Sequence, residues 1–225
     1  FNLAAVSDIY EGAGVSSSAC FEALIAKAVS VLFNNDSLPS DQMAAISHYA
    51  ENVYFGKPGG LLDQIGVSFG GVCYVDFKYE QPEVELLSFP FAMRIFLINS
   101  ARDHSDLTDL YAEIPADMHA VARHMYGKDY LREITREQYF ARMTMPYPSL
   151  SERAKMRATH FFEENTRVYK GKLALEKHDE AAFLAAVNDS GYSSQVMLAN
   201  TMVPGQYAGS PQEVIDTLRP YVGQA

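Results

Sequence analysis

The chain has few of the residues that mark disulfide-bonded, zinc-binding or membrane-spanning proteins. It contains only two cysteines, Cys20 and Cys73, and no tryptophan. The cysteines have no CxxC spacing, so we expect neither a disulfide framework nor a zinc site, and interpret both as small buried residues. The longest apolar run, near residues 95–98, is far shorter than the roughly 20 residues that cross a bilayer. No charged and apolar leader opens the chain, which favours a cytoplasmic location.

No stretch gathers lysines and arginines into a stripe, and the formal net charge is -10 at pH 7. The positive field that attracts nucleic acids or anionic membranes is therefore missing, and we expect neither partner. An anionic substrate would have to be held locally by backbone N–H groups, a metal ion or a few cations. The hydrophobic share of 48% is that of a globular protein. A chain of 225 residues can form two modest domains, and two α/β lobes are our first expectation.

The apolar pattern predicts mixed strands and helices up to about residue 99 and mostly helices beyond it. Strands are expected at residues 3–10, 72–77, 84–88 and 94–99 because of their β-branched and aromatic content. Helices are expected at residues 16–32, 39–56, 106–125, 149–172, 179–191 and 211–221, with a helical turn at 61–64. The polar segment near residues 77–90 is the best candidate for a boundary between lobes.

The segment from Gly12 to Ser18, with the sequence GAGVSSS, lies between a predicted strand and the first predicted helix. Glycines let the backbone turn sharply, serine hydroxyl groups donate hydrogen bonds, and a helix N-terminus carries a partial positive charge. A phosphate group is the natural ligand of such a segment. The alternative is an ordinary serine-capped helix after a tight turn. The segment differs from the GxxxxGK[ST] loop because no lysine follows it.

Two carboxylates, Glu51 and Asp63, lie twelve residues apart across a glycine-containing loop. One comes late in a predicted helix and the other opens the next element, so the two could converge on a cation. Phosphoryl transfer requires a metal ion that bridges phosphate oxygens and a carboxylate that orients the attacking hydroxyl group. The alternative is two solvated surface carboxylates, and spacing alone does not decide between them.

The histidines and possible nucleophiles give no further site. His104 follows a predicted strand in the segment 99–105, where it is either a base or an ordinary loop histidine. The other five histidines form no set with metal-ligand spacing, and the chain has no G-x-S-x-G nucleophile motif. We therefore expect no histidine metal site and no covalent catalysis.

Two segments, taken in this order, resemble the galactokinases, a family of GHMP small-molecule kinases. Residues 12–19, GAGVSSSA, are similar to the GxGLSSSA phosphate loop of that superfamily. Residues 50–64, AENVYFGKPGGLLDQ, are similar to the galactokinase stretch AE-x-x-x-x-G-x-x-x-G-x-M-D-Q, with Leu62 in place of Met. A third segment, Asn99-Ser100 with His104-Ser105 and Tyr111 beyond, resembles the strand-to-helix segment that follows the nucleotide lobe.

The resemblance implies that the chain binds Mg-ATP and phosphorylates the 1-hydroxyl group of galactose. It implies that Ser18 and Glu51 hold Mg²⁺ and that Asp63 is the catalytic carboxylate. Gly60, Asp63 and Tyr111 fall where family members contact the sugar. The residues implied to wrap the ATP phosphates are Gly12, Ala13, Gly14, Ser16, Ser17 and Ser18.

The resemblance also implies the two-lobe GHMP kinase fold, with an α/β lobe and an α+β lobe and the active site between them. Residues 1–80 would be part of the N-terminal, ATP-binding domain. Residues 81–225 would be an incomplete, mostly helical C-terminal lobe of ferredoxin-like type. The opening signature GR-x-N-x-x-GEH-x-D and the late glycine-rich motif of galactokinases are both missing. We therefore expect a piece that lacks both ends and is incomplete or inactive alone.

Other functions stay open beside galactose phosphorylation. A related kinase could act on another sugar, such as an N-acetylated galactosamine, or on a different small alcohol. A sensor could bind galactose and ATP in the same pocket without turnover, and a remnant of the fold could bind no ligand. The galactokinase, the related kinase and the sensor would all have small molecules as partners. The sequence predicts no oligomeric state.

Overall fold

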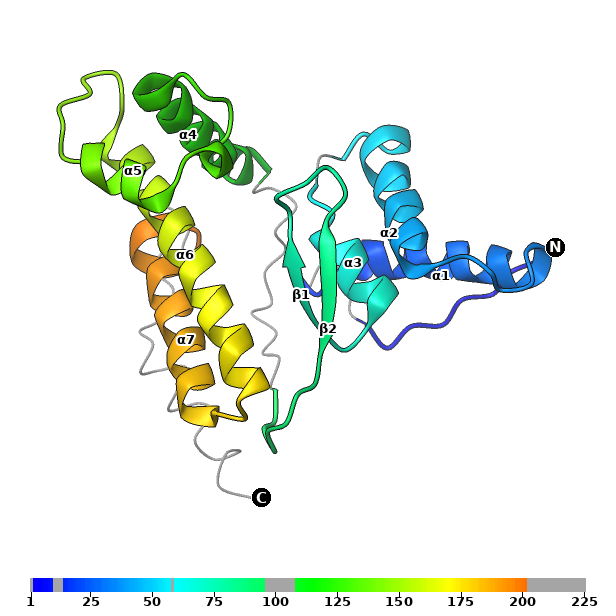
Figure 1. Cartoon of the computed structure of the whole chain (residues 1–225). Helices are drawn as coiled ribbons and strands as arrows, with labels where there is room; N and C mark the ends of the chain where they lie inside the picture. The colour runs from blue at the N-terminus through cyan, green and yellow to red at the C-terminus, as the bar shows by residue number, and fades with distance from the viewer. Residues whose placement is uncertain (1, 10–13, 58, 96–107, 202–225) are drawn as a thin grey trace. The chain divides into compact units, whose positions relative to one another are not determined.

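The computed structural model of the protein describes residues 2–9, 14–57, 59–95 and 108–201 (Figure 1). Contacts divide the chain into two compact units. Unit 1 contains Phe1–Leu110 and Tyr169–Leu184, and unit 2 contains Tyr111–Val168 and Ala185–Ala225. The boundary between lobes that the sequence analysis put after residue 80 stays a prediction. Each of the two units contains two separate stretches of the chain.

The first half of unit 1 is a set of three packed helices. Helix α1 spans Ser17–Phe33, α2 spans Ser40–Tyr49 and α3 spans Leu62–Phe69. Helix α2 packs against both α1 and α3, and it continues directly into the π-helical turn η1, Ala50–Tyr54. The wide turn of η1 matters for the site because π-helical turns change which side chains face a neighbouring helix. The predicted turn at residues 61–64 is the start of α3, which extends to Phe69.

A two-stranded antiparallel hairpin follows α3, at two of the segments that the sequence predicted to be strands. Strand β1 spans Val72–Asp76 and β2 spans Glu83–Leu87. Val72 lies opposite Leu87 and Asp76 opposite Glu83. Lys172 Nζ, from the part of α6 in unit 1, forms an ion pair with Glu85 at 2.5 Å and lies over the Tyr74 ring.

Two predicted strands are corrected by the structure. Residues 2–9 contain no strand, and residues 94–95 of the strand predicted at 94–99 contain none either, whereas its remainder lies outside the described residues. An apolar, β-branched segment becomes a strand only when a neighbouring strand pairs with its N–H and C=O groups. Among the described residues, the sheet consists of β1 and β2 alone.

The described part of unit 2 is helical, and the start of α4, the end of α6 and the start of α7 belong to unit 1. Helices α4, Thr108–Tyr126, α6, Glu152–Glu176, and α7, Glu180–Ser193, lie close to their predicted positions. The sequence missed three short elements: η3, Leu131–Glu133, α5, Arg136–Arg142, and η4, Ser194–Leu198. The helix predicted at 211–221 lies outside the described residues. No described helix is long and apolar enough to cross a membrane.

The core of unit 2 surrounds Tyr139 of α5. Its side chain is fully buried and its ring stacks on Phe162. Its hydroxyl group donates a hydrogen bond to the Lys155 carbonyl at 2.7 Å. Its hydroxyl group also lies 2.9 Å from Thr159 Oγ1. This buried ring and its polar partners hold the short helix α5 against α6, together with the ion pair between Arg136 and Glu163.

Candidate functional site

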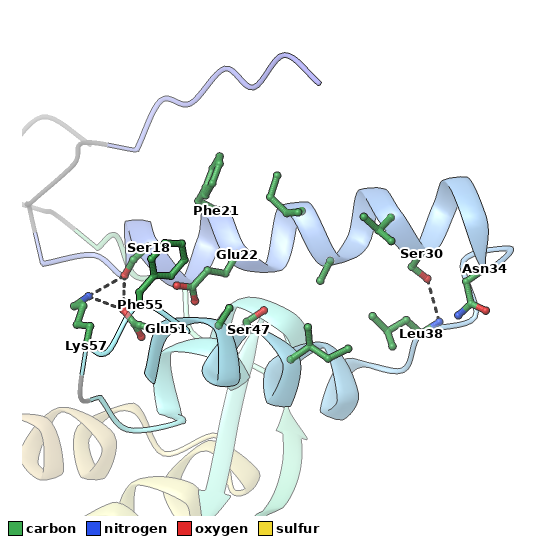
Figure 2. Close-up of a pocket in the computed structure, with 15 residues that line it drawn as sticks. Ser18, Phe21, Glu22, Ser30, Asn34, Leu38, Ser47, Glu51, Phe55 and Lys57 are labelled. Atoms are coloured by element: carbon green, nitrogen blue, oxygen red, sulfur yellow. Dashed lines mark hydrogen bonds and ion pairs between the residues drawn. The ribbon is translucent and has the colours of Figure 1, made fainter. Parts of the chain in front are cut away.

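Ser18 meets two side chains that lie 33 and 39 residues later in the sequence, beside the N-terminus of α1 (Figure 2). Ser18 lies in the first turn of α1, Glu51 lies in η1, and Lys57 follows η1. Ser18 Oγ donates a hydrogen bond to Glu51 Oε1 at 2.9 Å. Lys57 Nζ donates to the same Oε1 at 2.5 Å and lies 3.3 Å from Ser18 Oγ. We call these three residues the Ser-Glu-Lys cluster.

The backbone after η1 explains why Lys57 turns back toward Glu51. Gly56 has a φ of 67°, in the left-handed region that glycine adopts without a Cβ penalty. The Lys57 N–H then donates to the Glu51 carbonyl at 3.0 Å, similar to the closing hydrogen bonds that end helices at a left-handed glycine. This turn brings the lysine side chain back over the carboxylate.

The carboxylate of Glu51 is buried and is held on both oxygens. Only 7% of the residue is exposed, and Gln64 Nε2 donates to Glu51 Oε2 at 2.7 Å. Burial of the carboxyl group opposes its ionisation. The hydrogen bonds from Lys57, Ser18 and Gln64 outweigh that cost and hold the pKa of Glu51 below its usual value. Glu51 is therefore an ionised carboxylate at neutral pH, with a fixed orientation.

A second carboxyl group, that of Glu22, lies one helical turn beyond Ser18 in α1. Burial and the neighbouring Glu51 carboxylate raise its pKa above the usual value. Its Oε2 atom is buried and forms no hydrogen bond of ordinary geometry among the described residues, although Gln64 lies near enough to offset part of the rise in pKa. The sequence analysis did not single out Glu22, although the i, i+4 spacing from Ser18 places both residues on one helix face.

A pocket of about 760 Å³ extends along the groove between α1 and α2 (Figure 2). The Ser-Glu-Lys cluster lies at one end, and Ser30 and Asn34 lie at the other. The buried Ser47 Oγ also lines the pocket and has no hydrogen-bond partner among the described residues. The volume is in the range of small-molecule pockets. Most of its wall is apolar and includes Phe21, Ile25, Val29, Ile46 and Phe55.

The predicted phosphate loop is described only from Gly14 onward, and Gly12 and Ala13 lie outside the described residues. Gly14 has a φ of 70° and Ser16 has a φ of 59°, so the backbone enters α1 through two left-handed residues. Such a conformation is uncommon for serine and marks a constrained entry turn. Ser16 makes no side-chain hydrogen bond that caps the helix, and its carbonyl accepts from Cys20 N at 3.0 Å.

Asp63 is exposed in the first turn of α3, next to the buried Gln64 that contacts Glu51. The loop before it is attached to the end of α2 and to η1. Gly59 N donates to Asn52 Oδ1 at 2.8 Å, and His48 Nε2 lies 3.1 Å from the Gly59 carbonyl. The chain therefore reaches Asp63 through a loop whose start is fixed beside the Ser-Glu-Lys cluster.

The two other predicted sugar contacts lie in different units. Gly60 is exposed in the loop before α3, with open space where a Cβ would lie. Tyr111 belongs to unit 2 and lies in α4, and its side chain is outside the described part of the structure. His104 is also outside the described residues. The cysteines Cys20 and Cys73 are free and only half-buried.

The oxygen atoms of Ser18 and Glu51 fit one type of metal site. Within the described residues, no group of three or more His, Cys, Asp or Glu side chains could hold a metal ion. Mg²⁺ commonly uses one or two protein ligands and completes its shell with substrate phosphates and water. A hydroxyl oxygen and an ionised carboxylate oxygen 2.9 Å apart suit that arrangement.

Comparisons with known proteins agree with the motifs. Residues 1–71 match the family model described as GHMP kinases N terminal domain. Galactokinase of Actinobacillus pleuropneumoniae serotype 5b (strain L20) is 32% identical over 181 residues, which are 79% of this chain and 46% of that protein. Galactokinase of Roseiflexus sp. (strain RS-1) is 28% identical over 194 residues, 82% of this chain and 47% of that protein.

A solved structure shows the same fold. The crystal structure of Lactococcus lactis galactokinase complexed with galactose aligns with a TM-score of 0.65 and 23% sequence identity, over 85% of this chain and 50% of that chain. The resemblance to galactokinases that the two motifs predicted is thus confirmed, as is the GHMP kinase fold. The chain spans about half the length of the curated relatives that it matches.

Proposed function

We propose that this chain is part of a galactokinase that transfers the γ-phosphoryl group of ATP to the 1-hydroxyl group of galactose, giving galactose 1-phosphate and ADP. One observation carries the proposal beyond sequence similarity. Ser18 and Glu51, 33 residues apart, contact each other through Oγ and Oε1 at 2.9 Å beside the N-terminus of α1. A phosphate-binding turn and a metal-binding oxygen pair at one place are what phosphoryl transfer requires.

Ser18 and Glu51 are the proposed ligands of Mg²⁺. These two residues would hold the ion beside the start of α1, where, when bound, it would supply positive charge against the charge that develops on the transferred phosphoryl group. Gln64 holds the second oxygen of Glu51, so Oε1 stays turned toward Ser18. The backbone N–H groups at the start of α1 and the hydroxyl groups there would hold the phosphates of ATP. The residues concerned are Gly12, Ala13, Gly14, Ser16, Ser17 and Ser18.

Asp63 is the proposed catalytic carboxylate. Its exposed side chain would accept a hydrogen bond from the sugar 1-hydroxyl group and orient the oxygen toward the γ-phosphorus. The new O–P bond forms as the bond to the β-phosphate oxygen breaks, ADP leaves, and the hydroxyl proton passes to Asp63 or to water. Gly60 and Tyr111 are the proposed sugar contacts beside it. The two proposed substrates, ATP and a sugar, are small molecules, which fits an enzyme that works in the cytoplasm.

The first experiment measures ADP release with Mg-ATP on a panel of galactose, N-acetylgalactosamine and glucose. It compares the 225-residue chain with a version extended at both ends to the length of its relatives. Galactose-dependent ADP release from the extended protein supports the proposal. Release with another sugar of the panel instead moves the substrate to that sugar.

Turnover and binding are separated by a second measurement on the same proteins. Isothermal titration with galactose and with ATP reports binding without chemistry. If both ligands bind the extended protein and no sugar of the panel releases ADP, the chain is part of a sensor and the kinase proposal is wrong.

A further inference from the structure

We infer that Lys57 is a built-in cation of the metal site, which holds Ser18 and Glu51 in place without metal and must leave Glu51 Oε1 when Mg²⁺ binds. Its flexible side chain would thereby set the affinity of the site for the metal. The inference rests on the proposed function, because it takes Ser18 and Glu51 as the ligands of Mg²⁺.

The positions of three atoms support the inference. Lys57 Nζ lies 2.5 Å from Glu51 Oε1 and 3.3 Å from Ser18 Oγ. These two oxygen atoms are 2.9 Å from each other, so all three pairs are in contact (Figure 2). The ammonium group therefore contacts both of the atoms that would ligate the metal. Two cations cannot share one oxygen atom at this distance without strong repulsion.

The two charged partners differ in how free they are to move. The Glu51 side chain is 9% exposed and the Lys57 side chain is 64% exposed. Gln64 donates to Glu51 Oε2, whereas the lysine contacts the other oxygen, Oε1. Lysine has a long, flexible stem that can carry its charge into solvent. Opening the ion pair therefore moves the lysine and leaves the carboxylate where it is.

The sign of the effect follows from the cost of a buried charge. A buried carboxylate without a cation is strongly unfavourable, so the lysine stabilises the metal-free protein. The metal ion must displace the lysine from Glu51 when it binds. The free energy of metal binding is therefore less favourable by the free energy of the ion pair between Lys57 and Glu51. Removal of the lysine should therefore tighten metal binding, which is the opposite of what removal of a ligand does.

The test uses Mn²⁺ alone as the probe and the ¹⁵N-labelled 225-residue chain. Paramagnetic broadening of the backbone amide signals of Ser18 and Glu51 is followed as Mn²⁺ is added. We expect Lys57→Met to bind Mn²⁺ about three- to tenfold more tightly than the unmodified chain, a range that corresponds to a half-exposed ion pair. Lys57→Arg keeps the cation and should stay within about twofold of the unmodified chain.

The matched control is Lys27→Met. Lys27 is a half-exposed lysine of the same helix as Ser18, and it forms an ion pair with Asp36 at 2.6 Å. This substitution removes the same formal charge without touching the Ser-Glu-Lys cluster, so it measures the general effect of a more negative protein on cation binding. The effect of Lys57→Met must exceed that of Lys27→Met.

Thermal unfolding gives a second readout that a merely structural lysine would not produce. Without metal, Lys57→Met should have a lower Tm than the unmodified chain because Glu51 has lost its cation. Saturating Mn²⁺ should raise the Tm of Lys57→Met more than that of the unmodified chain, since ligand stabilisation grows with affinity. Lys57→Gln keeps a neutral donor beside Glu51 and provides the same comparison if the methionine variant does not fold.

Failure of the inference differs from failure of the metal site. If Lys57→Met binds Mn²⁺ no more tightly than Lys27→Met does, and Glu51→Gln abolishes binding, the metal site stands and the role of Lys57 is wrong. If Glu51→Gln binds Mn²⁺ as the unmodified chain does, Glu51 is not a ligand. In that case the metal site of the proposed function fails, and the inference about Lys57 fails with it.

Discussion

Gln64 Nε2 donates a hydrogen bond to Glu51 Oε2 at 2.7 Å, so the residue that follows Asp63 in α3 fixes the carboxylate in η1. Asp63 and Glu51 are the two carboxylates with proposed roles in catalysis and metal binding. Gln64 therefore connects the element that carries one with the side chain of the other. The contact is fully buried on the glutamine side.

Gln64→Leu should destabilise the protein by about 2 to 3 kcal/mol, because a buried charged oxygen loses its donor. Urea unfolding followed by circular dichroism measures the change. Gln195→Leu is the control, since Gln195 is exposed in η4, and it should change stability by less than about 0.5 kcal/mol. Equal effects of the two substitutions would show that the hydrogen bond to Glu51 contributes nothing.

Asp63→Asn in the extended protein should lower kcat about 10²- to 10⁴-fold, the usual contribution of a general base, with the KM for ATP almost unchanged. The side chain is exposed, so the substitution should leave the Tm within about 1 °C. Asp41→Asn, at an exposed position in the first turn of α2, is the matched control. Near-normal turnover by Asp63→Asn would end the assignment of this carboxylate.

The contribution of Glu51 to stability should depend on pH in the direction of a paired carboxylate. Its folded pKa lies below its usual value, so the unfolded chain binds more protons between those two pKa values and stability rises with pH there. The stabilisation is complete above about pH 4.5 and is lost as the pH falls through the folded pKa. Tm scans of the unmodified chain and Glu51→Gln should converge as the pH is lowered. Parallel curves would contradict the lowered pKa.

Glu22 should show the opposite dependence. Its folded pKa is raised by burial and by Glu51, so the folded state binds more protons than the unfolded chain above about pH 4.5, and stability falls as pH rises through that window. Glu22→Gln removes the carboxyl group. Its Tm relative to the unmodified chain should increase from pH 4 to pH 7, whereas that of Glu51→Gln should decrease. A common trend for both variants would mean that neighbouring charge does not separate the two pKa values.

Tyr139→Phe tests the core of unit 2. The ring stays and the hydroxyl group is lost, together with its hydrogen bonds to the Lys155 carbonyl and Thr159. We expect a loss of about 0.5 to 1.5 kcal/mol in urea unfolding, the net contribution of a hydrogen bond, because Thr159 Oγ1 still donates to the Lys155 carbonyl at 2.9 Å. Tyr192→Phe, at a ring that is 68% exposed, should be close to neutral. A neutral Tyr139→Phe would mean that the hydroxyl group contributes nothing to the attachment of α5.

Periodicity predicted the long elements well. Helix α1 begins at Ser17, one residue from its predicted start, and the hairpin strands lie within one residue of the predicted 72–77 and 84–88. The helix carries its own signal in the repeated spacing of its apolar residues, and the two strands carry theirs in their β-branched and aromatic content. The predicted strand at residues 3–10 failed over its described part, since strand formation depends on a partner that local sequence does not reveal.

Helix α5 shows a signal that was present but not used. It has only seven residues, too few for a convincing apolar repeat. Thr135 accepts from Gln138 N at 3.2 Å, and Gln138 Oε1 accepts from Thr135 N at 2.8 Å. This reciprocal capping box has the sequence T-x-x-Q and could have marked the start of the helix.

The candidate site was found in part. Ser18 and Glu51 were paired through motif resemblance, and the structure brings the two side chains into contact. Gln64 stood inside a quoted motif without a role. Lys57 had no signal of its own, because its return to Glu51 depends on the π-helical turn and on the φ of Gly56 rather than on residue spacing. Roles that arise from backbone turns are hard to read from residue types.

The turn at Gly56 would make the affinity of the proposed metal site adjustable from a position that supplies none of its proposed ligands. A Cβ at Gly56 would meet no atom within 4 Å, so a substitution there would change only the backbone preference. Asparagine tolerates the left-handed region better than alanine, and alanine better than valine. A graded series of residues at position 56 would therefore weaken, step by step, the turn that holds Lys57 beside Glu51. The metal affinity of the proposed site could be changed in this way while both of its proposed ligands, Ser18 and Glu51, stay the same.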